Sequence, residues 1–547
     1  MNADAVILDG YVDEPACLGV PPYLSPYVRT VAGVCIEHGY RVRYVTIDQV
    51  RGDPQMLREF SSAAFVLVIA GVTVPGKYLG GSPATLTEIQ QAGSMLRGTR
   101  RLIAGPIGFG FSPEGGKKAI KQEISGFDRF LPGSPAEALD RYLSGDGGPG
   151  IPDYSQSDRW AVLGSPIITQ HPSFPFLMCE LETARGCSRH ITGGCSFCTE
   201  PLYGPPRYRS PEGIGSEVAA LYKEGARHFR LGRQPDLLVY GAKGGEFPAP
   251  RPGCIRELFE TIRSSAPDLK TLHIDNVNPG TIARHEEASR EVLQEIVAGH
   301  TPGDVAAFGM ETADPAVVAA NNLKADPEQV MDAIRIVNEI GGGRKDGIPD
   351  LLPGLNFVTG LAGETLRTFD LNERFLREVL ESGLLVRRIN IRQVMPFEGT
   401  RVYQNNTLGC HEARFRSFKE FVRNQIDTPL LSRVFPVGTV LREVIIEKPG
   451  DISFGRQMGS YPILVGIPFN LKARMVTDVV VVSHGMRSVT GFPVPVRPND
   501  LPLAALRWIP GVGKKKAGMI AVRRPFSSHD QFRAIAGPTV LDPFLEF

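Results

Sequence analysis

Three cysteines lie close together in ARGCSRHITGGCSFCTEP, residues 184–201, of a chain that has eight cysteines in all. Cys187, Cys195 and Cys198 could form a disulfide, bind zinc, hold an iron–sulfur cluster or be neighbours by chance. Structural zinc sites take four ligands, and Cys179 is the one further cysteine nearby. An iron–sulfur cluster on three thiolates leaves one iron free for an exogenous ligand.

Length and composition set the context for this group. The chain has 547 residues, 42% of them apolar and 22% charged, which predicts two to four soluble domains. Its net charge of +1 means that any basic surface must be local. The start, MNADAVILDGYVDEP, lacks the basic region of a signal peptide, and no apolar stretch approaches a membrane span. We expect a cytoplasmic protein with no membrane partner, in which disulfides are disfavoured.

Residues 1–145 alternate strand and helix patterns. The spacing predicts a parallel, doubly wound α/β domain, since parallel strands need helical crossovers. The segment 146–174 opens with a run rich in Gly and Pro and is predicted to be a linker. The expected strands cover 5–12, 41–48, 63–72 and 100–110, and the expected helices cover 25–40 and 82–98.

Residues 175–428 repeat the strand–helix rhythm about six times. This predicts a partial (β/α)6 TIM-type barrel, whose reactive groups should lie at the C-terminal ends of its strands. The cysteines directly follow the first of these strands, and no P-loop or GxGxxG motif opens a helix. The expected strands cover 177–184, 228–234, 271–277, 306–313, 355–363 and 387–397, with helices such as 326–341 and 365–383 between them.

The pattern changes after Pro429. Four short β runs without intervening helices predict a small antiparallel β-barrel over 429–498. The last segment, 499–547, is helical and basic, and residues 501–547 hold seven Lys or Arg against three Asp or Glu. The fold class expected is therefore α/β, a partial barrel with a doubly wound N-terminal domain, a small β-barrel and a C-terminal helical module.

The segment ETARGC…CSFC resembles the signature of radical S-adenosylmethionine (SAM) enzymes, in which three cysteines hold a [4Fe–4S] cluster. The usual spacing in that family is CxxxCxxC, whereas seven residues separate Cys187 from Cys195 here. The resemblance makes Cys187, Cys195 and Cys198 the metal ligands and catalytic residues. Zinc at this site stays an alternative.

The resemblance extends along the middle domain and implies a SAM site there. The segments LGRQPDLLVYG, FGMETAD, NFVTGLAGET and RINIRQVMPFEGT are similar to the family's motifs around SAM. Four residues in these segments also have a purely structural interpretation. Gly360 and Gly363 could form turns, Glu311 could cap a helix, and Arg392 could form an ion pair. The residues implied to bind the cofactor are Phe197, Gly232, Gln234, Glu311, Gly360, Gly363 and Arg392.

The chemistry that this resemblance implies needs both cofactors. A reduced cluster with one open iron binds the amino and carboxylate groups of SAM and cleaves it reductively to a 5′-deoxyadenosyl radical. The radical then takes a hydrogen atom from the substrate, and the barrel orients the reactants and excludes water. An external electron donor such as ferredoxin or flavodoxin is expected as a partner.

The C-terminal segment LAALRWIPGVGKKKAGMIAVRRPFSS, residues 503–528, contains no acidic residue and resembles a helix-hairpin-helix motif. Such a hairpin can grip a nucleic-acid backbone without reading sequence. A helical packing or protein-docking module is the alternative. The residues expected to contact nucleic acid are Gly511, Gly513, Lys514, Lys515, Lys516, Arg523 and Arg524.

The β-rich segment 429–498 is similar to the TRAM domain, an RNA-binding barrel that follows the radical SAM barrel in tRNA methylthiotransferases. Those enzymes hold a second cluster on three N-terminal cysteines, and this chain offers only Cys17 and Cys35 there. Cobalamin-binding relatives often carry a DxHxxG motif, and DGYVDEPACLG has no such histidine. A second cluster or a cobalamin, the latter with residues 72–85 as its loop, is thus possible but unsupported by motif.

Taken together, the chain resembles radical SAM proteins that have a C-terminal helix-hairpin-helix and a methylthiotransferase-like domain order. We expect an enzyme that modifies RNA, tRNA in particular, by methylation, thiolation or methylthiolation. One alternative is a radical SAM enzyme that acts on a protein or small metabolite. Another is a non-enzymatic protein that binds zinc and RNA.

Overall fold

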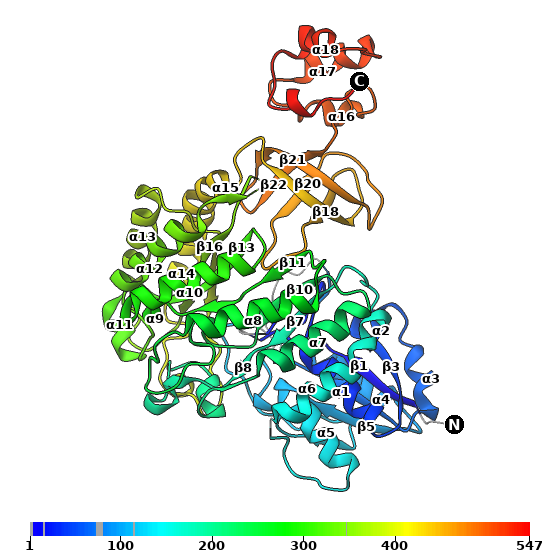
Figure 1. Cartoon of the computed structure of the whole chain (residues 1–547), viewed down its shortest axis with the longest axis vertical. Helices are drawn as coiled ribbons and strands as arrows, with labels where there is room; N and C mark the ends of the chain where they lie inside the picture. Colours follow the sequence, from blue (N-terminus) through cyan, green and yellow to red (C-terminus); the bar gives the residue numbers. More distant parts are fainter. Residues whose placement is uncertain (1–3, 15–16, 73–79, 113–114, 152, 346) are drawn as a thin grey trace.

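The computed structural model describes residues 4–14, 17–72, 80–112, 115–151, 153–345 and 347–547. The N-terminal and middle domains lie side by side and form a broad body, from which the two C-terminal modules rise one after the other (Figure 1). The last helices are therefore the part of the chain farthest from the N-terminal domain.

The N-terminal domain is built on one five-stranded sheet in the order β3-β1-β4-β5-β6, with all neighbouring strands parallel. Helices supply the crossover connections that parallel strands need. The strands are β1 (Asp4–Asp9), β3 (Arg41–Thr46), β4 (Phe65–Ile69), β5 (Arg100–Ala104) and β6 (Arg129–Leu131). The helices are α1 (Pro26–Glu37), α2 (Ile47–Gly52), α3 (Met56–Glu59), α4 (Leu86–Met95) and α5 (Pro135–Leu143).

Each face of this sheet packs into its own core. Ala5 and Ile7 of β1 belong to the core that also contains α1, whereas Val6 and Leu8 belong to the core that contains Ile89 of α4. A strand that is buried on both faces needs apolar residues at every position, which explains the uninterrupted run AVIL. The domain is therefore doubly wound, as the sequence predicts.

Residues 146–174, expected to form a linker, instead contain helix α6 (Tyr154–Leu163) and the short helix η3 (Ser165–Gln170). Trp160 of α6 is 1% exposed. Its indole N–H donates to Glu37 of α1 at 2.6 Å. The Gly- and Pro-rich run ends at Asp153, whose side chain caps α6, so the helix begins where the composition still suggests a loop. The segment is thus part of the folded body.

The middle domain contains two parallel half-sheets, in the orders β11-β10-β7-β2 and β12-β13-β16-β17. The six predicted βα strands are all present, and the third is split into β11 and β12. A short strand of the N-terminal domain, β2 (Tyr23–Leu24), pairs with β7 and so extends the barrel wall. The other strands are β7 (Met178–Glu182), β10 (His228–Gly232), β11 (Thr271–His273), β12 (Asn276–Val277), β13 (Asp304–Glu311), β16 (Leu351–Thr359) and β17 (Arg388–Gln393).

Helices cover the outer face of these strands, where the buried residues of both layers form one core. They are α7 (Pro211–Lys223), α8 (Pro252–Ser265), α9 (Pro279–Arg284), α10 (Glu286–Gly299), α11 (Pro315–Ala320), α12 (Pro327–Gly341) and α13 (Leu366–Glu381). The antiparallel ribbon β14 (Arg344–Lys345) and β15 (Ile348–Pro349) precedes β16.

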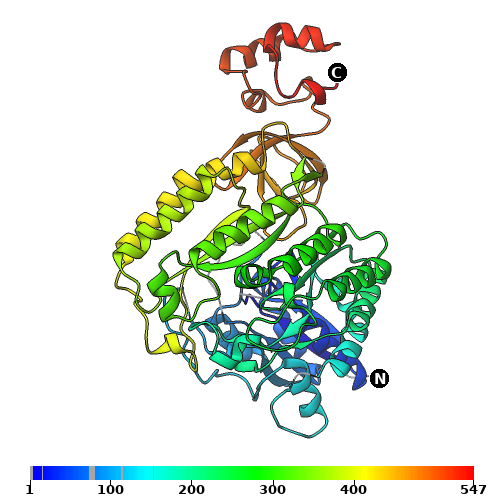
Figure 2. The same ribbon diagram turned by 60° about the vertical axis from the view of Figure 1, so that its left-hand side comes forward.

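A long continuous helical segment connects the barrel to the next domain (Figure 2). It consists of α14 (Glu412–Phe421), a π-helical turn over Val422–Asp427 and α15 (Thr428–Val434). Pro429 has no N–H to donate to the carbonyl of Gln425, which explains why regular hydrogen bonding gives way to a π turn before α15.

The small domain is a closed five-stranded barrel in the order β18-β19-β20-β22-β21. Most of its pairs are antiparallel, as predicted, but β20 and β22 run parallel. A closed barrel needs no helices because its own alternate residues fill the interior. The strands are β18 (Val440–Lys448), β19 (Ser453–Arg456), β20 (Leu464–Ile467), β21 (Val476–His484) and β22 (Ser488–Pro493).

The C-terminal module consists of α16 (Leu503–Leu506), α17 (Lys514–Arg523) and α18 (His529–Ala536). Its core is shared with the small barrel, because Val480, Phe492 and Val496 belong to the same buried cluster as Ile509 and Ile520. The module is therefore packed onto the barrel.

The predicted fold class is confirmed, including the doubly wound domain, the βα barrel and the small β-barrel. The loop proposed for cobalamin, 72–85, lies partly outside the described residues, because 73–79 are not described. Within the described chain, no helix combines the length and the apolar composition that crossing a membrane requires.

The crossing of α1 and α6 gives a testable prediction. A methyl group at Gly33 would overlap the main-chain carbonyl of Trp160. We expect Gly33→Ala to lower the free energy of unfolding by about 1–3 kcal/mol, the cost of overpacking, and to lower the midpoint of thermal unfolding. Gly253→Ala in α8 is the matched control, since nothing lies within 4 Å of a Cβ there. Equal midpoints for the two variants would contradict this packing.

Candidate active site

The cysteine loop, residues 186–206, starts just beyond the C-terminal end of β7. Its two ends are held together, because β8 (Ala184–Arg185) pairs antiparallel with β9 (Arg207–Tyr208). The long spacer between the first two cysteines forms the 3-10 helix η4 (Ser188–Thr192), followed by Gly193 and Gly194 with φ of 78° and 64°. Left-handed backbone of this kind favours glycine. The four additional residues are thus taken up by a compact turn that returns the chain to Cys195.

The three thiols are partly or fully buried. Cys195 is buried, and Cys187 and Cys198 are half-buried. Burial raises the pKa of Cys187 to about 11 and also raises the pKa values of Cys195 and Cys198. The charge of Cys195 adds to the pKa increase of both other thiols, so the three sulfurs lie within electrostatic reach of one another. Free thiolates are disfavoured here unless a metal or a cation stabilises them.

Two cationic side chains stand beside these sulfurs. The Arg189 guanidinium donates to Cys195 Sγ at 3.2 Å. Burial works against the charge of Lys324, but Cys195 and Glu311 raise its pKa above the ordinary value. These cations offset the negative charge that thiolate ligands would bring to the loop.

The donor set fits an iron–sulfur cluster. Among the residues that the structure describes, no three His, Cys, Asp or Glu side chains are arranged around one metal-ion position. A [4Fe–4S] cluster takes one thiolate at each of three irons, so its ligands surround a cluster and not a single point. Three soft thiolates with neighbouring cations are what such a cluster needs, and Cys187, Cys195 and Cys198 would hold it.

Several residues predicted to bind SAM lie against the cysteine loop. Phe197 packs with Cys195 and Cys198 in one apolar cluster, which also contains Leu408. Gly360 follows β16 with φ of 86°, and a Cβ there would press into the Leu408 side chain. The predicted aromatic residue and the predicted glycine are therefore brought to the same side of the loop.

The ends of β10 and β13 bring further predicted residues to this edge. Glu311, with φ of 58°, is buried; burial raises the pKa of its carboxyl to about 7, an increase that the positive charge of Lys324 limits. Gly232 ends β10, where a Cβ would collide with the Glu180 carboxylate. Gln234 is 2% exposed, and its Oε1 has no hydrogen-bond partner in the described chain. Gln234 thus offers a buried oxygen without a partner in the described chain, and Glu311 offers a buried carboxyl that Lys324 helps to ionise.

Gly363 and Arg392 lie outside this group. Gly363 precedes α13 with φ of 82°, beside Ala320. Arg392 in β17 is exposed. Its positive charge interacts with the buried Asp13 carboxyl: burial raises the pKa of Asp13 to about 6, and Arg392 limits that increase. Their assignment to the SAM site stays a prediction.

The predicted nucleic-acid residues fall into two groups. Lys516 donates to the carbonyls of Gly511 and Ala536, at 3.2 and 2.7 Å, and Arg524 donates to the Leu501 carbonyl at 2.6 Å. These two cations hold the module together. Gly511 (φ 81°) forms the hairpin turn. Of the residues predicted to contact nucleic acid, those that are exposed are Gly511, Gly513, Lys514, Lys515 and Arg523.

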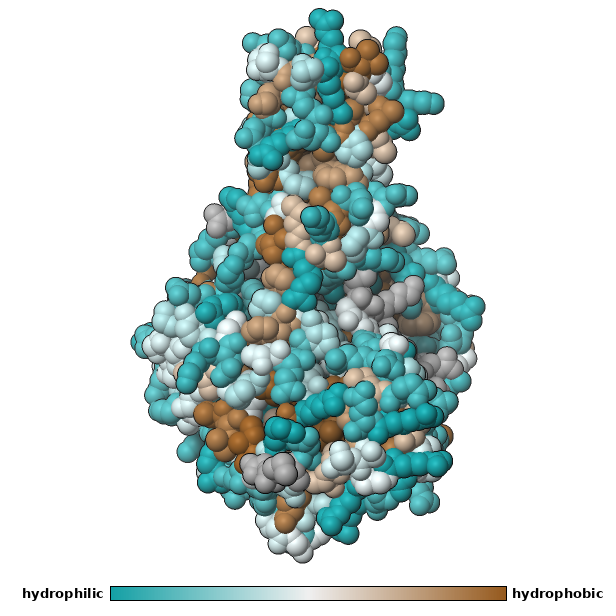
Figure 3. All heavy atoms as spheres, turned by 90° about the vertical axis from the view of Figure 1, so that its right-hand side faces the viewer, coloured by the Kyte–Doolittle hydropathy of each residue, from teal (hydrophilic) through white to brown (hydrophobic). Residues whose placement is uncertain are grey.

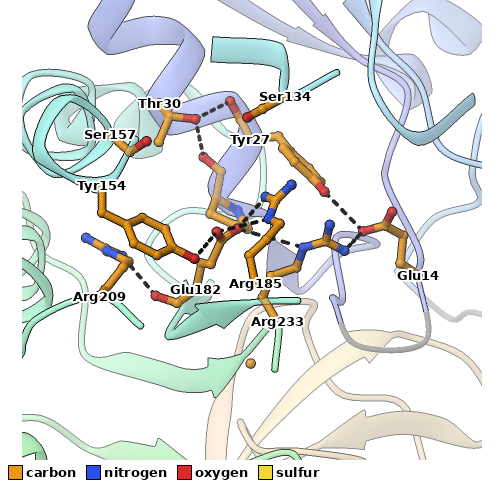
Figure 4. Close-up of polar contacts among 12 residues, drawn as sticks. Glu14, Tyr27, Thr30, Ser134, Tyr154, Ser157, Glu182, Arg185, Arg209 and Arg233 are labelled. Carbon is orange, nitrogen blue, oxygen red and sulfur yellow. Dashed lines mark hydrogen bonds and ion pairs between the residues drawn. The ribbon is translucent and has the colours of Figure 1, made fainter. Parts of the chain in front are cut away.

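Sequence reasoning missed a buried ionic network behind the cysteine loop (Figure 4). Glu182, at the end of β7, accepts from Arg185 at 2.6 Å and from the Tyr154 hydroxyl at 3.0 Å. Arg185 lies directly before the loop, and Tyr154 belongs to α6. The network therefore joins the first barrel strand, the loop and the N-terminal body.

Arg233 extends this network into the N-terminal domain. Its guanidinium pairs with Glu14, which also accepts from the Tyr27 hydroxyl at 3.2 Å. Glu182 and Glu200, which flank the cysteines in sequence, lie 3.8 and 3.9 Å from the same guanidinium. Arg233 is 2% exposed, so these carboxylates compensate a charge that water does not reach. Glu14 thus helps to fix both ends of the cysteine loop.

A loop of the small barrel enters the middle domain. Residues 457–463 connect β19 to β20, and within them Ser460 and Tyr461 contact Arg230 at 3.1 and 3.3 Å. Arg230 is fully buried and also pairs with Glu180 at 2.5 Å and with Asp275. The small barrel is therefore joined to the interior of the βα barrel by hydrogen bonds to a buried cation.

Comparison with known proteins agrees with this arrangement. Residues 181–391 match the model of the Radical SAM superfamily. An uncharacterized protein of Archaeoglobus fulgidus is 42% identical over 541 residues, 98% of each chain. One of Methanocaldococcus jannaschii is 42% identical over 512 residues, 90% of this chain and 93% of that protein.

Among solved structures, the chain is similar to the radical S-adenosylmethionine methyltransferase TsrM from Kitasatospora setae, whose structure has cobalamin and a [4Fe–4S] cluster bound. The TM-score is 0.52 at 14% identity, over 74% of this chain and 77% of that one, which is a likeness of fold. Residues 181–391 are therefore a radical SAM domain, and members of that superfamily use a [4Fe–4S] cluster and SAM.

The ligand assignment predicts three matching variants. Cys187→Ala, Cys195→Ala and Cys198→Ala should each abolish the iron content and visible absorption of anaerobically reconstituted protein, because a cluster needs all three thiolates. Cys254→Ala and Cys410→Ala are controls that remove a thiol outside the loop. Full iron content in any one of the loop variants would refute the assignment.

The buried network predicts a second effect. Glu14→Gln leaves Arg233 without its charged hydrogen-bond partner and should lower the free energy of unfolding by about 3 kcal/mol, as expected for a broken buried pair. Because both ends of the loop depend on Arg233, bound iron should also pass to a chelator faster than in the wild type. Asp146→Asn, at an exposed pair with Arg141, should change neither property. Identical behaviour of the two variants would rule out a positioning role for Glu14.

Proposed function

We propose that this radical SAM enzyme modifies RNA, tRNA in particular, by methylation, thiolation or methylthiolation. The observation that carries the proposal is the combination of a three-cysteine loop in a βα barrel with two further modules, a closed β-barrel and a basic helical module. The resemblance of these modules to TRAM and helix-hairpin-helix domains supports RNA as the substrate class.

The residues of the site would have separate roles in binding the cluster and SAM. Cys187, Cys195 and Cys198 would hold the cluster, and Arg189 would compensate its charge. When bound, the cluster and SAM supply a 5′-deoxyadenosyl radical, with one electron from a donor such as ferredoxin or flavodoxin. Phe197 and the residues near Gly360 would border the adenine. The apolar cluster around them would keep water from the reacting groups.

Two polar groups at the strand ends suit the polar parts of SAM. Gln234 is a buried amide whose Oε1 has no hydrogen-bond partner in the described chain, and such an oxygen is costly unless a ligand completes its hydrogen bonds. Glu311 is a buried carboxyl whose ionised form is favoured by Lys324. We expect the SAM amino group or ribose hydroxyls to be their partners. Lys324 would balance the charge of Glu311 when the latter is ionised.

The exposed lysines of the C-terminal module support the RNA part. Lys514, Lys515 and Arg523 are exposed, and no acid lies between residues 503 and 528. Such cations bind a phosphate backbone through counterion release, which makes binding salt-dependent. A protein or small-metabolite substrate is the alternative, with these modules as docking surfaces.

Cobalamin-assisted methyl transfer is the second candidate, favoured by a groove between the first two domains. The groove has a volume of about 970 Å³ and lies where parallel α/β sheets commonly bind ligands, beyond the first turn of α4. Its far wall includes Leu408, which also packs in the apolar cluster with Cys198. Residues that line it include Thr85, Phe111, Lys118, Ile120, Asn406 and Leu408.

The substrate proposal is tested by nucleoside analysis of tRNA from a strain that lacks the gene. We expect one modified nucleoside to disappear and to return when the wild-type gene, but not Cys198→Ala, is supplied. The purified protein should bind bulk tRNA with an affinity that falls steeply with salt, and replacing Lys514, Lys515 and Arg523 by Ala should flatten that dependence. Lys223→Ala, at an exposed lysine of α7, serves as the control. An unchanged nucleoside profile would reject RNA as the substrate.

A further inference from the structure

The C-terminal module exposes large apolar side chains on the same segment as its cations. Trp508 is 43% exposed, Met519 49% and Val522 88%. Lys515, Met519 and Val522 follow one another at helical spacing and so share one face of α17. A space-filling view shows apolar and hydrophilic side chains side by side on this module, at the top of the molecule (Figure 3).

The position of Trp508 is fixed although its ring is exposed. Leu506, Ile509 and Val512, its neighbours in the hairpin, are buried in the core shared with the small barrel. The main-chain N–H of Trp508 donates to the Ala505 carbonyl at 2.9 Å. In the described chain, no other aromatic ring and no cation packs on the Trp508 ring. A main chain held in place therefore presents an exposed aromatic side chain that has no stacking partner in the described chain.

The charged residues of the segment that carries this ring, 503–528, are all of one sign. Arg507 precedes Trp508, and Lys514 and Lys515 follow the hairpin turn; all three are exposed. Lys516 and Arg524 point inward to main-chain carbonyls, so the outward cations are a separate set. An exposed apolar group on a segment whose exposed charges are all positive suits an occupant that is both anionic and flat-faced.

Resting on the proposed function, we propose that Trp508 is a stacking platform for an unpaired stretch of the RNA substrate, with Lys514, Lys515 and Arg507 on its phosphates. Bases in a duplex are already stacked on both sides, so a protruding ring reaches them only where the strand is unpaired. Met519 and Val522 extend the apolar surface along α17 for a neighbouring base. The site selects the strand state of the RNA and does not read its sequence.

The chain makes a direct test possible, because it has only two tryptophans, and Trp160 is 1% exposed. Quenching of tryptophan fluorescence by acrylamide therefore reports mainly on Trp508. We expect a single-stranded RNA of about twelve nucleotides to protect this emission at saturation, and the same sequence annealed to its complement to protect it far less. Equal protection by both, or none by either, would overturn the proposal.

Variants separate stacking from charge. Trp508→Ala should weaken binding of the single-stranded RNA about tenfold or more with an unchanged salt slope, whereas Trp508→Phe should keep most of the affinity. Lys514→Ala combined with Lys515→Ala should reduce the slope. Met486→Ala, at an apolar residue 56% exposed on the small barrel, is the matched control, and thermal unfolding of the full chain checks that each variant folds. Wild-type affinity in Trp508→Ala would overturn the platform.

Different results would reject the proposed stacking platform and the proposed RNA substrate. If Trp508→Ala restores the tRNA modification to a deletion strain at the wild-type level, the enzyme modifies RNA and the platform is wrong. If RNA protects Trp508 but the deletion strain has an unchanged nucleoside profile, the platform stands and the substrate assignment is wrong.

Discussion

The structure depends on one electrostatic constraint: three sulfurs of a single loop must become anionic ligands inside a shielded pocket. Burial alone opposes this, and the raised pKa values of the three thiols express that cost. Arg189 and Lys324 supply nearby positive charge, and a metal cluster supplies the rest. The compact turn after Cys187, closed by two left-handed glycines, places the sulfurs together in spite of the long spacing.

Both neighbouring domains make buried contacts with the βα barrel. The N-terminal domain adds β2 to the barrel wall, and its Glu14 pairs with Arg233. Arg233 also lies close to Glu182 and Glu200, the acids on either side of the cysteines. Ser460 and Tyr461 of the small β-barrel accept hydrogen bonds from Arg230 in the interior of the βα barrel. The N-terminal domain therefore has a short, buried ionic connection to the cysteine loop, and the small barrel has a buried connection to the interior of the βα barrel.

Local pattern was sufficient to predict much of this molecule. The apolar runs of the strands and the helices between them are properties of short segments, so the fold class could be predicted. The cysteine spacing is also local, and the ligand role that it suggests stays a prediction. The ionic networks could not, because Glu14 and Arg233 are 219 positions apart and Arg230 and Tyr461 are 231 apart. The same limit explains Lys516, which in sequence looks like its neighbour Lys515 but points inward to two carbonyls. Composition likewise gave no sign of α6, whose first residues follow a Gly- and Pro-rich run.

The most direct test of the central claim is electron paramagnetic resonance of the reduced, anaerobically reconstituted protein with and without SAM. A cluster held by Cys187, Cys195 and Cys198 with one open iron should give the signal of a reduced [4Fe–4S] centre, and adding SAM should shift its g values because SAM binds that iron directly. A signal that SAM leaves unchanged, or no iron–sulfur signal at all, would contradict the account.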